Sequence, residues 1–354
     1  MKGLYNKLYV GLIIALSLVS CTEIIEFDTD REGGQLVVDG TITTGLGPFE
    51  LYLGKTAAIE RKTIPVDGAT VQLFDDQGNS EPYQGQGEGR YLLPGLIIKP
   101  AIGRSYFLRI ELADGTLYES KKETVPPIWG QLDSVYFNFE KQEELNSYGN
   151  IVTFQVVNAL VDMSVEQQAG QSSFFRFDVE EVYRLSPTDF PDPFGAIPPP
   201  CYISEYSNSR DFLLTDVKGN QTNKLQGLKV ATQIMNWRFD EIHYFNVYLQ
   251  SLTEDGYTYW SQVHQTISNI GTIFDAPPAP VKGNIFNVND QEEQVLGYFG
   301  AVTRDTLRNF LNPGDTPRRP LFDCAFSFFS NDYPMRCLDC LSVPGSSYQR
   351  PDYF

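Results

Sequence analysis

The sequence predicts a mainly β protein: an antiparallel sandwich followed by a larger β-rich region with one or two short helices. Apolar residues alternate with polar ones along short segments, and turn residues interrupt these segments at regular spacing. A proline pair at 126–127 separates two stretches with this pattern. The 354-residue chain is 42% apolar, with 24 Phe and 20 Tyr, which suffices to fill the cores of about two domains.

The first region, residues 34–125, has the pattern of short antiparallel strands. Turns at 76–79 and 113–115 reverse the chain between the alternating sets. This spacing is typical of immunoglobulin-like or prealbumin-like sandwiches, and the stretch from Gly68 to Tyr91 resembles the prealbumin-like class. The alternating sets are Leu36, Val38 and Ile42; Phe49, Leu51 and Leu53; Val71 and Leu73; and Tyr106, Leu108, Ile110 and Leu112.

The second region, residues 126–354, is again mainly strands and contains the best-marked helix of the chain. Thr253 is a suitable cap, acidic residues occupy the first turn, and apolar residues then recur every three or four positions up to Ile267. Asn269 and Gly271 end this pattern. A shorter helix is expected from Asp305 to Leu311, stopped by the Asn-Pro pair that follows.

The first twenty-one residues have the three parts of a lipoprotein signal peptide. Lys2 and Lys7 give a positive start, and residues 8–19 form an uncharged apolar run that is too short to span a bilayer. The run ends in Leu18-Val19-Ser20-Cys21, the pattern of a lipobox. We therefore expect cleavage after residue 20 and acylation of Cys21, detectable with labelled palmitate, which anchors the chain to a membrane. The alternative is an ordinary secretory signal with a chance cysteine.

Residues 21–33 are expected to form a lipidated acidic tether. The twelve residues from Thr22 to Gly33 reach about 40 Å when extended. Acidic residues directly after the lipidated cysteine resemble the surface-export signal of Bacteroidota lipoproteins, although Ile24 and Ile25 interrupt them here. This resemblance implies an outer-membrane protein exposed at the cell surface. The alternative is an outer-membrane lipoprotein on the periplasmic face.

The charge balance excludes nucleic acid as a partner. The chain has 27 basic and 45 acidic residues, a net charge of −18, and loss of the two leader lysines leaves −20. Binding to a phosphate backbone needs a positive patch. Because anionic headgroups repel such a chain, lipid on Cys21 is its expected means of membrane attachment.

Four cysteines remain once Cys21 is assigned to lipid: Cys201, Cys324, Cys337 and Cys340. An even number in an exported chain favours disulfides. The CxxC spacing of Cys337 and Cys340 also occurs in redox motifs and zinc sites, but Pro334 before it and a Pro-Gly loop after it do not fit a redox motif at a helix start. We expect Cys337 and Cys340 to pair with Cys201 and Cys324, in an order left open, and to staple the C-terminal segment to the second region.

Few residues point to catalysis. The two histidines, His243 and His264, have no accompanying nucleophile, metal or phosphate-binding motif. The neighbouring acids Glu180-Glu181 and Glu292-Glu293 are adjacent in sequence, so their side chains diverge on a strand or a helix. We therefore expect a non-enzyme with no catalytic residue, no cofactor and no metal.

One loop is a candidate for contact with a partner. Between Gly271 and Asn287, proline and glycine restrict the backbone to special angles around an aromatic residue. Such a loop docks a partner or, in the alternative structural role, straps the preceding helix onto a sheet. The candidate docking residues are Phe274, Pro277, Pro278 and Asn284.

Short motifs follow one another over nearly the whole mature chain. They include VVDG at 37–40, VDGATV at 66–71, GRSY at 103–106, DGTLY at 114–118, YTYW at 257–260, GTIFDAPP at 271–278, GNI at 283–285, VLGYF at 295–299 and the ending CLDC…PDYF at 337–354. In this order they resemble the Bacteroidota lipoprotein family of domain of unknown function 4249. Members tend to be encoded beside TonB-dependent outer-membrane transporters. The resemblance implies a surface accessory to such a transporter in nutrient capture, with no ligand or catalytic residue carried over; the alternative is a structural or adhesive surface lipoprotein.

Overall fold

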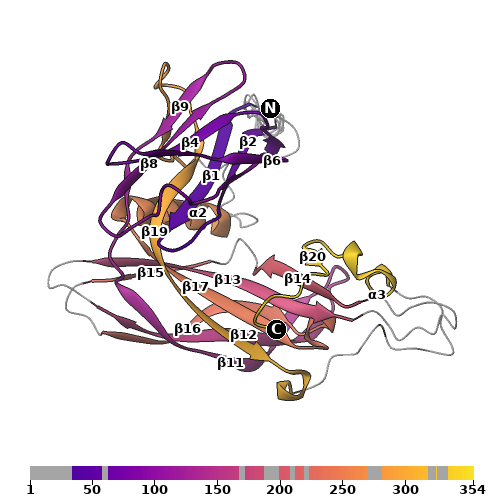
Figure 1. Ribbon diagram of the computed structural model, residues 1–354. Coiled ribbons are helices and arrows are strands. Elements are labelled where there is room, and N and C mark those ends of the chain that lie inside the picture. Colours follow the sequence, from indigo (N-terminus) through magenta and orange to yellow (C-terminus); the bar gives the residue numbers. More distant parts are fainter. Residues whose placement is uncertain are drawn as a thin grey trace, which may run out of the picture.

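The computed structural model describes residues 34–57, 63–166, 172–186, 199–207, 212–218, 223–269, 281–317, 324 and 334–354. Within these residues the chain is mainly β and forms two sandwiches, with the N-terminal one standing at an angle on the second (Figure 1). The predicted fold class is therefore confirmed.

The first sandwich has two sheets whose alternating apolar residues face each other. Leu36, Val38 and Leu51 from one sheet share a core with Leu73 and Leu108 from the other, and all five are fully buried. Its first sheet contains β1 (Leu36–Thr43), β2 (Phe49–Thr56), β3 (Thr63–Pro65), β6 (Gln84–Gly87), β7 (Arg90–Leu93) and the first half of β19 (Leu296–Leu311). Its second contains β4 (Thr70–Asp75), β5 (Ser80–Pro82), β8 (Ser105–Glu111), β9 (Leu117–Ser120), β10 (Glu123–Thr124) and β18 (Ile285–Asn287).

The second sandwich is built from longer strands. Its core is rich in phenylalanine, with Phe175, Phe177 and Phe245 packed against Val157 and Val161 of the facing sheet. One sheet contains β13 (Ser173–Leu185), β14 (Cys201–Tyr206), β15 (Leu213–Val217), β17 (His243–Leu252), β20 (Ser346–Ser347) and the second half of β19. The facing sheet contains β11 (Gly130–Leu145), β12 (Ile151–Val165) and β16 (Lys224–Ile234).

Strand β19 belongs to both sandwiches (Figure 1). Residues 296–302 pair in parallel with β1, and residues 303–311 pair antiparallel with β17, so one eleven-stranded sheet runs through the molecule. The helix expected from Asp305 to Leu311 is wrong. Leu307 and Leu311 fit a four-residue period, but they also fit a two-residue period, and hydrogen bonding to β17 selects the strand.

The first sandwich is completed by residues that follow the Pro126-Pro127 boundary. β18 pairs with β9, and the first half of β19 pairs with β1. Residues 34–125 thus supply most of this sandwich but not all of it. The proline pair separates two stretches of sequence, whereas the two cores interlock through β18 and β19.

Helix α2 (Glu254–Asn269) agrees with the sequence prediction. The Thr253 hydroxyl accepts a hydrogen bond from the Gly256 N–H at 3.2 Å, which is the expected cap. Tyr257 stacks on Phe174 of β13, and Trp260 meets Phe212 edge-on, so the helix packs beside the junction of the two sandwiches. The remaining helical segments are α3 (Met335–Leu338), η1 (Trp237–Phe239), η2 (Pro313–Asp315) and η3 (Cys340–Ser342).

Candidate docking surface

The four C-terminal cysteines form two disulfides in the structure. Cys201 pairs with Cys340, and Cys324 pairs with Cys337. The expectation that the CxxC cysteines have separate partners is confirmed, and the structure supplies the order. The first bridge joins β14 to the C-terminal segment across 139 residues, so it fastens that segment to the second sandwich.

The loop proposed for docking is only partly described. Cys21 and three of the loop residues, Phe274, Pro277 and Pro278, lie outside the described residues. Asn284 is described, and its assignment as a docking residue is wrong because only 5% of its surface is exposed. Its side chain donates to the Phe299 carbonyl at 2.8 Å and accepts from the Phe299 N–H at 2.9 Å. Because both hydrogen bonds join Asn284 to the backbone of strand β19, this side chain has a structural role.

Asn284 belongs to a polar network at the junction of the sandwiches. The buried Glu123 carboxylate accepts hydrogen bonds from Asn284 at 2.9 Å, Tyr298 at 2.7 Å and Thr253 at 3.3 Å. Burial raises the pKa of Glu123, and these three donors oppose that shift. The network ties β10, the residue before β18, strand β19 and the start of α2 together. It holds the corner between the sandwiches in one geometry.

The adjacent acids and both histidines have structural partners. Glu180 and Glu181 lie on opposite faces of β13, as expected for a strand. Glu181 is buried and faces His243 at 2.9 Å, whereas Glu180 accepts from Tyr248 at 2.5 Å on the outer face. His264 packs edge-on against Phe212. These contacts bring no two carboxylates together across an open site.

The outer face of the eleven-stranded sheet bends at the middle of β19. On the first sandwich, strand register places Asp39 between Tyr298 and Tyr52. On the second, Arg176, Gln250 and Arg304 form one row across β13, β17 and β19. We call this surface the elbow face; its residues are Asp39, Tyr52, Arg176, Asp178, Glu180, Tyr206, Tyr248 and Arg304.

The parts of the elbow face on the first and second sandwich are close enough for their charges to interact. Solvent reaches Asp39, yet the surrounding protein removes enough hydration to raise its pKa; the positive charge of Arg176 on the other half opposes the shift. Burial likewise raises the pKa of Tyr206, which is 63% exposed, and charges from both halves act on it, including Glu180 and Glu50. Charged groups of both halves thus act on the residues beside the bend.

Helix α2 closes one end of the elbow face. The Arg176 guanidinium lies 3.7 Å from the Trp260 ring centroid and pairs with Asp178 at 2.8 Å. Tyr259 stacks on Tyr298 at 4.7 Å, and burial raises the pKa of Tyr259 to about 12. A pocket of about 10 Å³ remains in the corner beside Trp260 and Tyr298, with room for roughly one water molecule. The helix therefore packs into the bend of the face, where Tyr298 and Val302 are buried.

The C-terminal residues cover the far end of the same face. Arg308 lies 3.3 Å from the Tyr353 ring centroid, the Tyr353 carbonyl accepts from Tyr244 at 3.1 Å, and Phe354 packs on the Tyr244 ring. The second-sandwich half of the elbow face is thus bounded by α2 on one side and by the chain end on the other.

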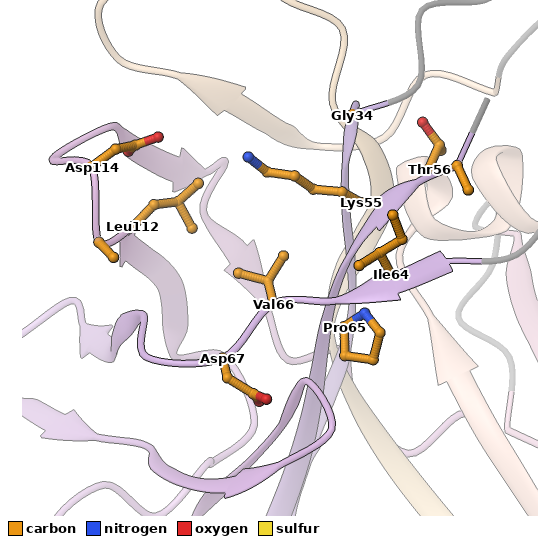
Figure 2. Close-up of a pocket in the computed structure, with 11 residues that line it drawn as sticks. Gly34, Lys55, Thr56, Ile64, Pro65, Val66, Asp67, Leu112 and Asp114 are labelled. Carbon is orange, nitrogen blue, oxygen red and sulfur yellow. The ribbon is translucent and has the colours of Figure 1, made fainter.

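A larger hollow than this corner pocket lies at the end of the first sandwich where the described chain begins (Figure 2). Its volume is about 640 Å³, and Figure 2 shows Lys55 reaching across it towards the turn that carries Leu112 and Asp114. Gly34 and Ala57 on its rim adjoin residues outside the described ranges. The elbow face consists of described residues and is the surface considered below.

The described residues contain no group of three or more His, Cys, Asp or Glu side chains placed to hold a metal ion. No helix among them is long and apolar enough to cross a membrane.

Comparison with known proteins places the chain in a family. The profile of the domain of unknown function DUF4249 matches residues 22–308. The chain belongs to the DUF4249 family. The match spans most of both sandwiches, including β18 and most of the shared strand β19. Family membership therefore agrees with the motifs that pointed to it.

Other comparisons add little. No curated protein matches the chain. A solved structure of a DUF4785 family protein from Legionella pneumophila is 9% identical, with a TM-score of 0.19 over 60% of this chain and 52% of that one. The chain thus spans about half the length of that protein, and so low a score supports no argument about function.

Sequence reasoning did not find the elbow face. Asp39 and Arg304 are 265 positions apart; Asp39 belongs to the VVDG motif, and Arg304 belongs to no motif. The available signal was the polar half of each alternating strand. Which polar faces meet depends on the bend in β19, and that bend has no local sequence signature.

Proposed function

We propose that this DUF4249 chain is a Bacteroidota outer-membrane lipoprotein, exposed at the cell surface, that acts as a non-catalytic accessory to a TonB-dependent transporter in nutrient capture. The observation that carries the proposal is the elbow face, where tyrosine, arginine and acidic side chains from both sandwiches lie on one side of a continuous sheet. Surfaces rich in tyrosine and arginine are typical of binding sites.

The leader supports the cellular setting of this role. Residues 1–21 have the pattern of a lipoprotein signal ending in Cys21. Lipid on Cys21 would confine the chain to the same membrane plane as an outer-membrane barrel, which raises the effective concentration of one for the other. A modest contact at the elbow face is then sufficient to keep the two proteins together.

Two measurements test the proposal. After mild detergent extraction from its own cells, the purified protein should carry a TonB-dependent barrel in stoichiometric amount. Consistent absence of a barrel would contradict the transport role and favour a structural or adhesive surface protein. Protease added to intact cells should cleave the protein, whereas protection would place it on the periplasmic face.

The lipid anchor has its own test. Cys21→Ser should abolish labelling with radioactive or alkyne-tagged palmitate and leave the chain uncleaved or soluble in the periplasm. Thr22→Ser is the matched control, because it changes the neighbouring side chain but leaves Cys21 in place. Normal labelling of the Cys21→Ser variant would refute the anchor.

A further inference from the structure

We propose that the outer edge of strand β11 takes up an extended, basic segment of the transporter partner as an added β-strand. This inference rests on the function proposed above and adds a second contact, on the sheet that faces the eleven-stranded one. It follows from the unpaired backbone groups of β11, from the length by which β11 outruns its sheet, and from the charges along it.

Strand β11 is an edge strand, so its backbone is paired on one side only. In the three-stranded sheet β11-β12-β16, strand β12 pairs with β11 over residues 130–145. On the opposite side, the Val135 carbonyl accepts a hydrogen bond from the Asn309 side chain of β19 at 2.6 Å. Alternate residues of a strand present their backbone groups to the same edge. Val135 therefore marks the outer edge, and every second residue after it belongs to that edge.

Beyond Val135 the outer edge of β11 is open. Its backbone groups make no hydrogen bond to any described residue outside the hairpin with β12. The edge-facing residues are Phe137, Phe139, Lys141, Glu143 and Leu145. They span about 27 Å at the rise of a β-strand. Proline or a bulge commonly blocks such an edge, but residues 137–145 contain no proline and no register shift. Rows of free N–H and C=O groups at this spacing match the backbone of another strand.

The far part of β11 lies beyond the sandwich core. Pairing of β12 with β16 ends at Val156, and the last hydrogen bond of the segment after β16 goes to the Gln155 carbonyl. Residues 142–154 thus form a two-stranded arm, and all residues from 140 to 151 are exposed. The Asn146 side chain closes its turn by accepting from the N–H groups of residues 148 and 150 at 3.0 and 2.9 Å. Because a ribbon of two strands is only marginally stable in water, a third strand would stabilise it.

The charges of β11 favour a basic strand over a second copy of this chain. Residues 140–144 contain three glutamates and one lysine, and none has an ion pair with a described residue. Lys or Arg side chains on the added strand would lie beside these carboxylates, whereas a second copy would bring further glutamates. At the tip, Leu145 lies opposite Ile151, and these side chains are 72% and 69% exposed. They offer an apolar contact at the end of the added strand.

A proline on the outer edge tests the proposal in the full-length lipoprotein, expressed in its own cells. Glu143→Pro removes an edge N–H but no hydrogen bond to β12, so it should lower the amount of co-purified barrel by about tenfold. Thr153→Pro is the matched control. Thr153 lies two residues before Gln155, so its N–H points to the β16 side, where β16 no longer pairs. This variant should retain the barrel. Unchanged thermal unfolding would show that both variants are folded.

Charge reversal provides a second test that leaves the backbone unchanged. The double variant Glu140→Lys/Glu144→Lys should also lower the co-purified barrel by about tenfold, because it places like charges beside a basic strand. Glu111→Lys reverses an exposed charge on β8 of the first sandwich and should retain the barrel.

Hydrogen exchange distinguishes strand addition from a contact between side chains. In the protein alone, the edge-facing amides of Phe139, Lys141 and Glu143 should exchange quickly, because they have no acceptor. In the complex with the barrel they should become protected, while the amide of Thr153 on the other edge should not change.

The outcomes separate the two proposals. If the wild-type protein carries the barrel but Glu143→Pro and the charge reversal both keep it, or the edge amides stay unprotected in the complex, the edge proposal is overturned and the accessory role stands. If the wild-type protein carries no barrel, the accessory role fails and this inference fails with it. A homodimer in light scattering that Glu143→Pro dissociates without loss of the barrel would assign the edge to a second copy and overturn the proposal.

Discussion

The two sandwiches differ in how they accommodate buried charge. In the first, the Glu81 carboxylate accepts hydrogen bonds from three consecutive backbone N–H groups, those of residues 96–98, at 2.7 to 3.0 Å. In the second, the Glu181 carboxylate faces the His243 ring at 2.9 Å, and both side chains are buried. Backbone donors cannot be mutated away, whereas a side-chain partner is lost in one substitution.

The sandwiches also differ in how they are closed. The first needs β18 and half of β19, which come from the far end of the chain. The second contains the other half of β19, and in addition the Cys201–Cys340 disulfide holds the C-terminal segment against β14. The first sandwich thus depends on strand pairing alone and the second also on a covalent link, so different substitutions should damage them.

The largest expected effect is at the shared strand. Gly297 has a φ of +96°, and a Cβ there would lie 1.8 Å from the Val38 carbonyl oxygen. Gly297→Ala should therefore destabilise the fold by about 3–5 kcal/mol, since it adds backbone strain to a clash that breaks the β1–β19 pairing. Urea unfolding of the purified protein measures this.

Gly300→Ala is the matched control on the same strand. Its Cβ would meet the Thr41 hydroxyl at 3.4 Å, which is ordinary contact. We expect a change of less than about 1 kcal/mol. Equal destabilisation by the two variants would show that the parallel pairing of β1 with β19 is not what joins the sandwiches.

The second effect is at the buried Glu181–His243 pair. Glu181→Leu should cost about 3–5 kcal/mol, because it removes the carboxylate that contacts the His243 ring and accepts hydrogen bonds from Ser207 and Gln233. His243 stacks between Phe239 at 4.2 Å and Tyr183 at 5.1 Å, so a phenyl ring fits its place. The double variant Glu181→Leu/His243→Phe should recover part of the loss in urea unfolding. A double variant that is less stable than the single one would mean that the contact between Glu181 and His243 itself stabilises the core.

The third effect compares the two disulfides. The Cys201–Cys340 bridge closes a loop ten times longer than the Cys324–Cys337 bridge, with sequence separations of 139 and 13. In the chain-entropy account, loss of either costs about 2–4 kcal/mol, and loss of the long one costs more. Paired serine variants in thermal unfolding should show this order.

Free-thiol analysis checks the same bridges in the native protein. Intact mass before and after alkylation should find no free thiol at any of the four positions in exported protein. Four reactive thiols, or zinc that protects them, would contradict the assignment of both bridges.

The smallest effect is a pH dependence at the junction. Because burial raises the pKa of Glu123 in the folded protein, protonation favours the folded state. Wild-type stability should therefore rise relative to Glu123→Gln as the pH falls through the folded pKa, and this gain should be complete below the ordinary glutamate pKa. Thermal unfolding between pH 4 and 8, roughly the range around that transition, measures the difference between the two proteins. A difference that does not vary with pH would contradict an uncompensated buried carboxyl group.

The local sequence pattern predicted the structure correctly where residues close in sequence determine it. Helix α2 begins at Glu254 because Thr253 caps it, and it ends at Asn269, as its periodicity indicated. The strands of the first region match the alternating apolar sets, since a strand with one buried face must alternate. Separate disulfide partners for Cys337 and Cys340 were likewise expected from the residues around the CxxC spacing.

The sequence pattern gave wrong predictions in two places. One segment fitted both a helical and a strand period, and one polar side chain had two possible roles. The segment from Asp305 to Leu311 satisfied both a helix and a strand, and pairing with β17 decided between them. Asn284 was predicted to dock a partner because it lies in the proline- and glycine-rich loop from Gly271 to Asn287, but its amide bonds the backbone of Phe299.

The sequence by itself determined the fold class, the capped helix, the leader pattern and the family, because each depends on residue types at short spacing or on motifs in a fixed order. Only the tertiary structure decided that β19 joins two sandwiches and that Asp39 and Arg304 lie on one bent face. The physical reason is that strand pairing links residues hundreds of positions apart through backbone hydrogen bonds. Those bonds are the same for every residue type except proline, so they leave little trace in the sequence.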